Sequence, residues 1–313
     1  MAVRQETEYH IPVLLKESVD FLVTDASGWY IDGTLGGGGH SEEILSRLNK
    51  NGKLFSFDKD EEAIEFSKLR FHKEIAKGKT NRLTILNRCF SRASSIEGIR
   101  GKLKGILLDL GVSSRQLDES RRGFSYRVNS RLDMRFGSHS SPTSADDILH
   151  AASQEELERI LRNYGEEPFA RQVARRIVQM RRLIPLKTSF ELKQIIEESV
   201  PRAALNKSLS RVFQALRIVA NRELDILKES LYSIAPSLAD GGRIVVISYH
   251  SLEDRIVKNF FKERQKKESN SLSTTTMPRM QSLTAKPIIP SEAEIEINPR
   301  SRSAKMRVAE KIQ

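Results

Sequence analysis

Short apolar runs, three of which end in an aspartate, alternate with helical patterns in the first third of this chain. The runs predict buried strands over 29–32, 53–58, 83–86 and 106–109. Helical periodicity stands between the first three of them, over 41–48 and 63–71. Strands that alternate with helices form βαβ units. This part of the chain therefore predicts a mostly parallel sheet with helices on both faces.

The alternation stops after Asp109. Residues 111–147 predict a long loop, and capping boxes at Ser153 and Thr188 then open helical patterns. A helix over about 211–234 leads to the most apolar strand, 243–248, and we expect a final edge strand over 305–309. We predict an α/β domain formed by 1–112 and 216–313, with an inserted all-α domain over 113–215 for substrate recognition.

The composition limits the class of protein. The chain has 38% hydrophobic and 30% charged residues, which is typical of a globular protein. It has no apolar run near the ~18 residues of a membrane helix, and residues 1–12 contain no signal-peptide core. We therefore expect a soluble cytoplasmic protein. Cys89 is the single cysteine, which excludes an internal disulfide and a cysteine-based zinc site. The histidines show no ligand spacing, so we expect no metal.

Positive charge is concentrated in particular segments. The whole chain carries a formal charge of +11, and residues 162–222 hold 13 Lys or Arg against 5 Asp or Glu. Residues 255–267 hold 6 against 1, whereas the first 60 residues hold 6 against 10. These basic segments predict a surface for RNA, with solvated helix faces as the alternative.

A glycine-rich loop, Gly36 to His40, follows the first strand and opens a helix. Its backbone N–H groups can face an anionic group. It lacks the third glycine of a dinucleotide site and the Gly-Lys of a P-loop, so a pyrophosphate is not favoured. An amino-acid carboxylate fits better; the alternative is a structural turn.

Two further acids stand at predicted strand ends. Asp58 lies 22 residues after Gly36, a spacing that suits a carboxylate accepting from both ribose hydroxyls of an adenosine; the alternative is a helix N-cap. Ribose and carboxylate recognition together indicate S-adenosylmethionine. Asp32 and Asp109 would balance its cationic amino and sulfonium groups.

Motifs along the whole chain carry a resemblance to one family. They are HIPVLL from 10, YIDGTLGGGGHS from 30, GILLDLGVSSRQLD from 105, GFS from 123, LDMR from 132, NYGEE from 163, FQALRI from 213, ISYHSLEDRIV from 247 and NPRSRS from 298. With these motifs the chain resembles the ribosomal RNA small-subunit methyltransferase H, or MraW, family. The resemblance implies a class I S-adenosylmethionine-dependent methyltransferase fold, Rossmann-like, with a helical insertion. It also implies N4-methylation of a decoding-site cytidine (cytosine-1402) of 16S rRNA in the small ribosomal subunit.

The same resemblance implies the cofactor contacts. The methionine part would be held by Gly38, Gly39 and His40, and the ribose by Asp58. The adenine pocket would be lined by Phe90, and the site would be completed by Asp109 and Gln116. One departure from the wider class is that Asp109 is followed by Leu-Gly-Val, without the Pro-Pro-aromatic that commonly holds a flipped base. Carbon-5 methylation would need a cysteine nucleophile, and Cys89 is best explained as a small buried side chain.

Methylation of an amino group needs a hydrogen-bond acceptor that orients it. Asp109 is the first candidate. The turn after the strongest strand supplies the second, with Ser248 as acceptor, Tyr249 to stack on the base and His250 to take the proton; a structural or RNA-contacting role for His250 is equally open. Two other functions compete, a dinucleotide-dependent oxidoreductase and a non-catalytic RNA-binding ribosome-assembly factor.

Overall fold

The computed structural model describes residues 11–75, 82–111, 122–137, 142–265 and 277–313. Gln116, one of the expected cofactor contacts, lies outside the described residues. Internal contacts divide the chain into unit 1, residues 1–111 with 224–313, and unit 2, residues 112–223. The second division falls after 223 and not after the predicted 215, because helix α10 (Leu205–Asn221) runs unbroken past 215. No helix in the described ranges is both long and apolar enough to cross a membrane.

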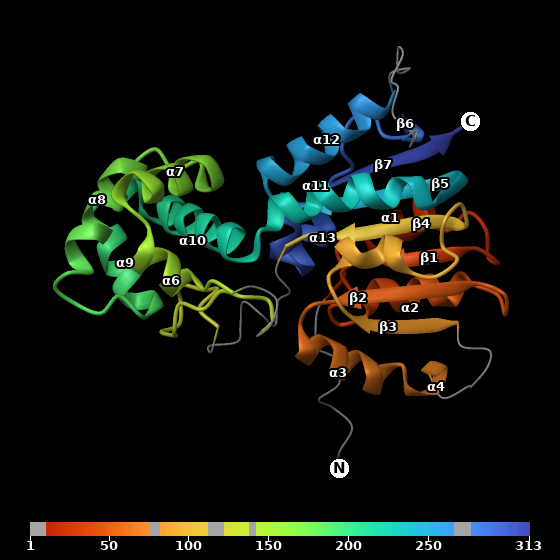
Figure 1. Cartoon of the computed structure of the whole chain (residues 1–313), viewed down its shortest axis with the longest axis horizontal. Coiled ribbons are helices and arrows are strands. Elements are labelled where there is room, and N and C mark those ends of the chain that lie inside the picture. The colour runs from red at the N-terminus through yellow and green to blue at the C-terminus, as the bar shows by residue number, and fades with distance from the viewer. Residues whose placement is uncertain (1–10, 76–81, 112–121, 138–141, 266–276) are drawn as a thin grey trace. The chain divides into compact units, whose positions relative to one another are not determined.

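Unit 1 is built on a seven-stranded sheet in the order β3-β2-β1-β4-β5-β7-β6 (Figure 1). The strands are β1 (Trp29–Asp32), β2 (Lys53–Asp58), β3 (Leu83–Asn87), β4 (Leu103–Asp109), β5 (Leu238–Ser248), β6 (Arg279–Ser282) and β7 (Lys305–Ile312). Only the pairings of β7 with β5 and with β6 are antiparallel. The mostly parallel sheet expected from the sequence is confirmed.

The strand order reverses at β1. From β1 the chain moves outward to β2 and β3, and then returns to β4 on the other side of β1. Ligands of open α/β sheets bind beyond the carboxyl ends of the strands at such a switch point. The glycine-rich loop follows β1 directly, so this topology places it where a ligand is expected.

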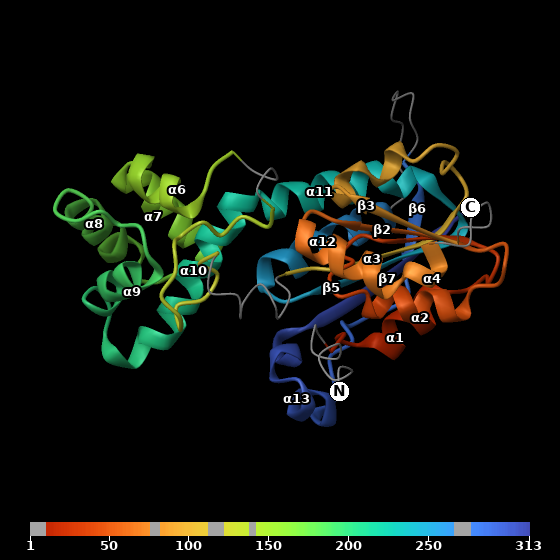
Figure 2. The same cartoon turned by 90° about the horizontal axis from the view of Figure 1, so that it is seen from below.

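Alternate strand residues supply two buried layers, because successive side chains of a strand point to opposite faces. Tyr30 belongs to the layer beneath α1 and α2, and Ile31 to the layer beneath α11 and α12. Figure 2 shows the strands between α11 on one side and α1 and α2 on the other. The helices of unit 1 are α1 (Leu15–Leu22), α2 (Gly39–Arg47), α3 (Glu61–Arg70), α4 (His72–Ile75), α11 (Glu223–Ile234), α12 (Ser251–Gln265) and α13 (Glu292–Ile297), with 3-10 turns η2 (Phe90–Ser95), η4 (Ala235–Ser237) and η5 (Pro299–Ser303).

Two predicted elements differ from the structure. Strand β7 is not an edge strand, because the short polar β6, which carries no apolar run, pairs with its outer side. The helix predicted over 211–234 is two helices, since Arg222 adopts a left-handed conformation with φ of +51° that ends α10. A non-glycine residue takes that conformation rarely, so the sequence carries no sign of this break.

In its described residues, unit 2 has an irregular segment over 122–137 and helices from 145 onward; no strand forms there, and one isolated bridge joins Arg131 and Thr188. Its helices are α6 (Ala145–Ala151), α7 (Gln154–Gly165), α8 (Ala170–Met180), α9 (Ser189–Glu197) and α10, with the 3-10 turn η3 (Arg202–Ala204). The capping boxes predicted at Ser153 and Thr188 are present at the starts of α7 and α9. Leu161 of α7, Val173 of α8 and Leu216 of α10 meet in a core of its own.

Candidate active site

The glycine-rich loop joins the end of β1 to the start of α2. Gly36 and Gly38 have φ of +49° and +82°, a left-handed conformation that glycine adopts without a steric penalty. A Cβ on Gly39 would lie 2.2 Å from Cγ of Pro12, so that glycine also leaves room for the N-terminal segment. The loop is therefore fixed by its own backbone and by packing, before any ligand arrives.

Asp58 lies at the end of β2, half-buried, beside this loop. Its Oδ2 accepts a hydrogen bond of 2.8 Å from the backbone N–H of Gly36, and its Oδ1 accepts one of 2.9 Å from that of Asp60. The N-cap of α3 is Asp60, whose side chain accepts from the N–H of Glu62, so Asp58 is not the cap. Burial raises the pKa of Asp58 to about 6.

Asp32 is fully buried at the end of β1. Its Oδ1 accepts from the N–H of Thr34 at 3.1 Å and its Oδ2 from the hydroxyl of Ser41 at 2.6 Å. Burial raises its pKa to about 6. Its two hydrogen bonds tie the loop after β1 to α2, and because the side chain is closed off from solvent, only its charge could reach a ligand.

Asp109, at the end of β4, receives contacts from three different elements. Its Oδ1 accepts a 2.9 Å hydrogen bond from the hydroxyl of Tyr249, and its backbone N–H donates to Oγ1 of Thr34 at 2.8 Å. Its Oδ2 lies 3.8 Å from Nδ1 of His40. Burial raises the pKa of Asp109 to about 7, although the hydrogen bond from Tyr249 opposes the rise. Asp109 is thus a carboxyl group that changes its charge near neutral pH.

His40 is buried near Asp109, although the sequence assigned it only to the methionine part of the cofactor. Its Nε2 lies 3.2 Å from the carbonyl oxygen of Val13. A carbonyl only accepts, so Nε2 carries a hydrogen in this contact, and Nδ1 is the ring nitrogen that lies near Asp109. At 3.8 Å, Nδ1 of His40 and Oδ2 of Asp109 are neighbours without a direct hydrogen bond between them.

Tyr249 follows β5 and is half-buried. Burial and the neighbouring Asp109 raise the pKa of Tyr249 well above the ordinary value, so its hydroxyl stays protonated and donates a hydrogen bond to Asp109. The sequence suggested stacking on a base but gave no sign of this bond. The bond forms because β4 and β5 are neighbours in the sheet and end at the same edge.

The two other catalytic candidates, Ser248 and His250, form contacts with neighbouring groups of the protein. Ser248 is buried and its hydroxyl donates to the carbonyl oxygen of Lys305 at 3.2 Å, which favours a role in holding β7. His250 has Nε2 3.2 Å from Oε1 of Glu253, and its Nδ1 accepts from the N–H of Glu253 at 3.4 Å. Glu253 is buried and also accepts from the N–H of Tyr249 at 2.9 Å. Sequence reasoning missed Glu253, for which the three-residue spacing from His250 at a helix start was the available signal.

Phe90 opens η2, shortly after β3, and is half-buried. Its Cβ lies 3.0 Å from the position that a Cβ on Gly33 would take, so the ring stands beside the loop that leaves β1. The thiol of the neighbouring Cys89 accepts from the N–H of Ser91 at 3.5 Å, which is a capping role.

Three carboxylates thus gather at the carboxyl ends of β1, β2 and β4. Within the described residues, Asp32, Asp58 and Asp109 form hydrogen bonds with backbone N–H and hydroxyl groups and not with lysine or arginine. Burial without a cationic partner is what raises their pKa values. A positively charged ligand would compensate the negative charge of these carboxylates. The three carboxylates therefore fit the sulfonium and ammonium groups of S-adenosylmethionine.

Comparison with known proteins points the same way. Residues 7–312 match the family model described as the MraW methylase family. A "Ribosomal RNA small subunit methyltransferase H" from Caldicellulosiruptor saccharolyticus is 47% identical over 97% of this chain and 99% of that protein. A protein of the same name from Heliobacterium modesticaldum is 42% identical over the same shares. Solved structures are less similar; NSun6 from Pyrococcus horikoshii, with 12% identity and a TM-score of 0.43, aligns with 100% of this chain and 56% of that one.

Proposed function

Because this chain belongs to the MraW methylase family, we propose that it methylates the exocyclic N4 of a cytidine, cytosine-1402, of 16S rRNA in the small ribosomal subunit. The chain is an S-adenosylmethionine-dependent rRNA methyltransferase, and the position and the atom on the RNA are the proposed part. The proposal is supported by the position of Asp109. Its carboxyl group is a hydrogen-bond acceptor that Tyr249 holds at the edge of the sheet, beside the point where the strand order reverses.

We propose that Asp58 accepts from the ribose hydroxyls, Phe90 lines the adenine pocket and Gly38, Gly39 and His40 hold the methionine part. Gln116, outside the described residues, stays an expected contact. The bound cofactor supplies a methyl group on a sulfonium, a leaving group that becomes a neutral thioether.

The cytosine amino group is a weak nucleophile because its lone pair is delocalised into the ring. A positioned acceptor therefore contributes much of the rate. Oδ1 of Asp109 is held by Tyr249, so Oδ2 is left to accept from the amino group and to orient its lone pair toward the methyl carbon. When the N–C bond has formed, the amino group must lose a proton. Oδ2 of Asp109 takes it, with Nδ1 of His40 as a second acceptor 3.8 Å away. His250 remains an alternative acceptor, although the contacts of its ring nitrogens are to Glu253.

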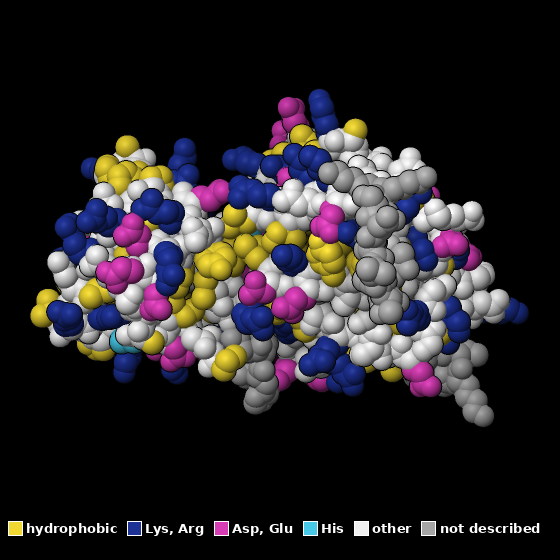
Figure 3. Space-filling model, turned by 45° about the horizontal axis from the view of Figure 1, so that its top comes forward, with side chains coloured by type: hydrophobic (Ala, Val, Ile, Leu, Met, Phe, Trp, Pro, Cys, Tyr) yellow, Lys and Arg dark blue, Asp and Glu magenta, His cyan; other side chains and the backbone are white. Residues whose placement is uncertain are grey.

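Unit 2 is proposed to recognise the RNA. Arg176 pairs with Glu198, and Arg181 donates to the carbonyl oxygens of Leu149 and Ala152, so these two arginines serve the fold. The others of this helical stretch, Arg171, Arg175 and Arg182, are exposed, and no described carboxylate pairs with them. Figure 3 shows many Lys and Arg side chains spread over one face of the molecule. Exposed cations of this kind bind phosphates and release counterions.

Incubation with labelled methyl donor and unmodified 30S subunits tests the function. We expect one methyl group per subunit, found as N4-methylcytidine after nuclease digestion. We expect the enzyme in the cytoplasm, where its ribosomal substrate is found. Absence of label in the rRNA, with binding to 30S subunits intact, would instead support the non-catalytic assembly factor.

The rate of methyl transfer should rise with pH through about 7. Asp109 can take the proton of the amino group only as a carboxylate, and its raised pKa of about 7 leaves it mostly protonated at pH 6. Below that pKa, kcat/KM for the cofactor should fall about tenfold for each pH unit. The bound cofactor is cationic and favours the carboxylate, so the inflection in kcat should lie at a lower pH than that in kcat/KM. Profiles between pH 5.5 and 9 measure both; a flat kcat/KM over this range would contradict the role of Asp109.

A further inference from the structure

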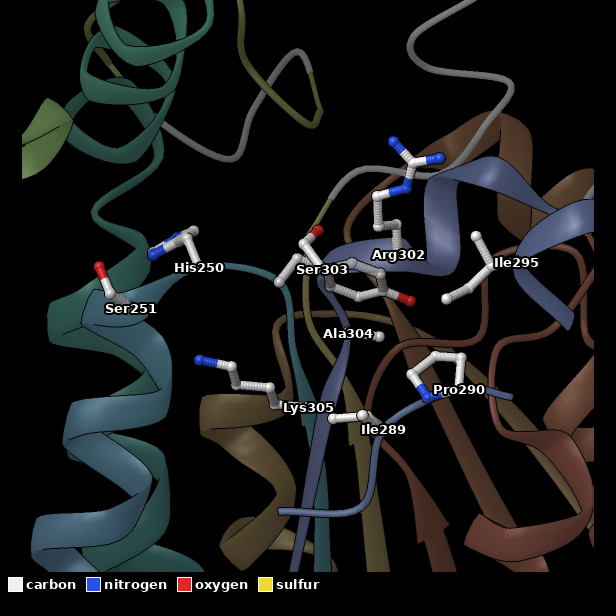
Figure 4. A pocket seen from close by; sticks show the side chains of 10 residues that line it. His250, Ser251, Ile289, Pro290, Ile295, Arg302, Ser303, Ala304 and Lys305 are labelled. Atoms are coloured by element: carbon white, nitrogen blue, oxygen red, sulfur yellow. The ribbon is translucent and has the colours of Figure 1, made fainter. Parts of the chain in front are cut away.

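A cavity of about 230 Å³ lies beside Tyr249, at the edge of the sheet that carries Asp109. Its walls are the turn 249–251, the residues Ile289 and Pro290 before α13, Ile295 of α13 and the segment 302–305 (Figure 4). Pockets for drug-sized ligands measure roughly 300–1,000 Å³, so this cavity takes something smaller. The proposed mechanism uses only Tyr249 and, as an alternative acceptor, His250 from these walls.

The sheet brings this cavity to the same edge as the methyl-transfer site. Strand β7 runs antiparallel to β5, so its first residue, Lys305, is paired with the last residue of β5, Ser248. From β2 to β7 the edge therefore presents Asp58, the glycine-rich loop, Asp109, Tyr249 and Lys305 in that order. The cofactor side and the cavity lie on opposite sides of Asp109, and Tyr249 stands between Asp109 and the cavity.

The walls of the cavity have a definite chemistry. None of its lining residues is acidic, and Arg302 and Lys305 are cationic with no ion pair to a carboxylate among the described residues. Tyr249, Ile289 and Pro290 supply an aromatic and apolar surface. In the view of Figure 4, the side chain of Arg302 points upward, and that of Lys305 lies lower and points to the left. An apolar surface between two cations suits a group that is flat and apolar in its middle and anionic at its ends.

We propose that this cavity binds one unpaired nucleotide of the substrate RNA, next to the cytidine that is methylated. Its base lies against Tyr249, Ile289 and Pro290, and the phosphates on either side of it meet Arg302 and Lys305. Aromatic and apolar contacts with a splayed base, combined with cations on the backbone, are how proteins hold single-stranded RNA. By holding this neighbour the enzyme would fix the position of the target base at Asp109. The inference rests on the proposed function, since it names a second contact of the same substrate.

Steady-state methylation of 30S subunits by Arg302→Ala and Lys305→Ala tests the proposal. We expect KM for the subunits to rise about tenfold in each variant, with kcat and cofactor affinity unchanged. The dependence of log KM on log salt should weaken by about 0.7 for each lost phosphate contact. Lys286→Ala removes an exposed lysine that lies three residues before Ile289 and does not line the cavity; it is the matched control and should change neither value. An unchanged KM and salt dependence in both cavity variants overturns the proposal, as does a loss confined to kcat.

A binding measurement separates this inference from the proposed function. Cytidine 5′-monophosphate should bind the full-length protein more tightly than uncharged cytidine, and the difference should disappear in the Arg302→Ala/Lys305→Ala double variant. Equal binding of the two by the unaltered protein overturns the cavity proposal even when methylation of 30S subunits is normal. If the unaltered protein transfers no methyl group, the proposed function fails, and the nucleotide titration still decides whether the cavity binds a phosphate.

Discussion

Asp109→Asn should lower kcat for methylation of 30S subunits by roughly 10²–10³, within the range that a positioned acid or base contributes. The amide keeps the size of the side chain and an oxygen that accepts from Tyr249, but it loses the negative charge and the site for the departing proton. Cofactor affinity should fall less than kcat, because Asp58 and the glycine-rich loop are unaltered. Single-turnover transfer at saturating cofactor, with a separate titration of cofactor binding, measures the two effects.

The stability of this variant distinguishes a reacting group from a structural one. The pKa of Asp109 is raised to about 7, above the ordinary value of about 3.9, so between these values the folded protein binds more protons than the unfolded chain. The contribution of Asp109 to stability therefore falls as pH rises through this interval, and at pH 8 the buried carboxylate is a net cost. The neutral amide removes that cost, so the melting temperature at pH 8 should stay the same or rise. Asp240→Asn, at an exposed side chain near the start of β5, is the control and should change neither property. An unaltered kcat in Asp109→Asn would remove this residue from the mechanism.

Much of the fold could be predicted because its signals are local. Three strands that end in an acid, and the helical patterns between them, predicted the parallel part of the sheet. The capping boxes at Ser153 and Thr188 predicted two helix starts, since each depends on residues only three positions apart. Strand β6 could not be predicted, because its four residues owe their conformation to pairing with β7.

The site was less predictable than the fold. Strand ends pointed to Asp58 and Asp109 because parallel strands bring their carboxyl ends to one edge. The bond between Tyr249 and Asp109 joins residues 140 positions apart and depends on β4 and β5 being neighbours, which no local pattern specifies. The hydroxyl of Ser248 points to β7 for a similar reason, since β7 comes from a distant part of the chain. Sequence patterns thus located the edge of the sheet, and tertiary pairing decided which side chains meet there.

Asp58→Ala should weaken the binding of S-adenosylmethionine by about 100-fold, while affinity for 30S subunits measured without cofactor changes less than about twofold. Hydrogen bonds to a charged group contribute roughly 1.5–3 kcal/mol each. Losing two of them to the ribose hydroxyls costs at least about 3 kcal/mol, and each 1.4 kcal/mol is a factor of about ten in affinity. Because the loss is one of cofactor binding, kcat should recover largely at saturating cofactor. Calorimetric titration of cofactor and of 30S subunits, each alone, provides the comparison.

Two further variants separate recognition of the ribose from support of the loop. Asp58 also accepts from the N–H groups of Gly36 and Asp60, so its removal disturbs the loop as well. Asp58→Asn keeps one acceptor oxygen for the loop but not the charge, and we expect its affinity for the cofactor to lie between those of the native protein and Asp58→Ala. Asp60→Ala removes the neighbouring carboxylate that caps α3, which should lower the melting temperature by the loss of a cap worth about 1 kcal/mol and leave cofactor affinity nearly unchanged. If Asp60→Ala weakens cofactor binding as much as Asp58→Ala, the effect comes from the loop and not from the ribose. If Asp58→Ala loses affinity equally for the cofactor and for the 30S subunit, Asp58 is not a cofactor-specific residue.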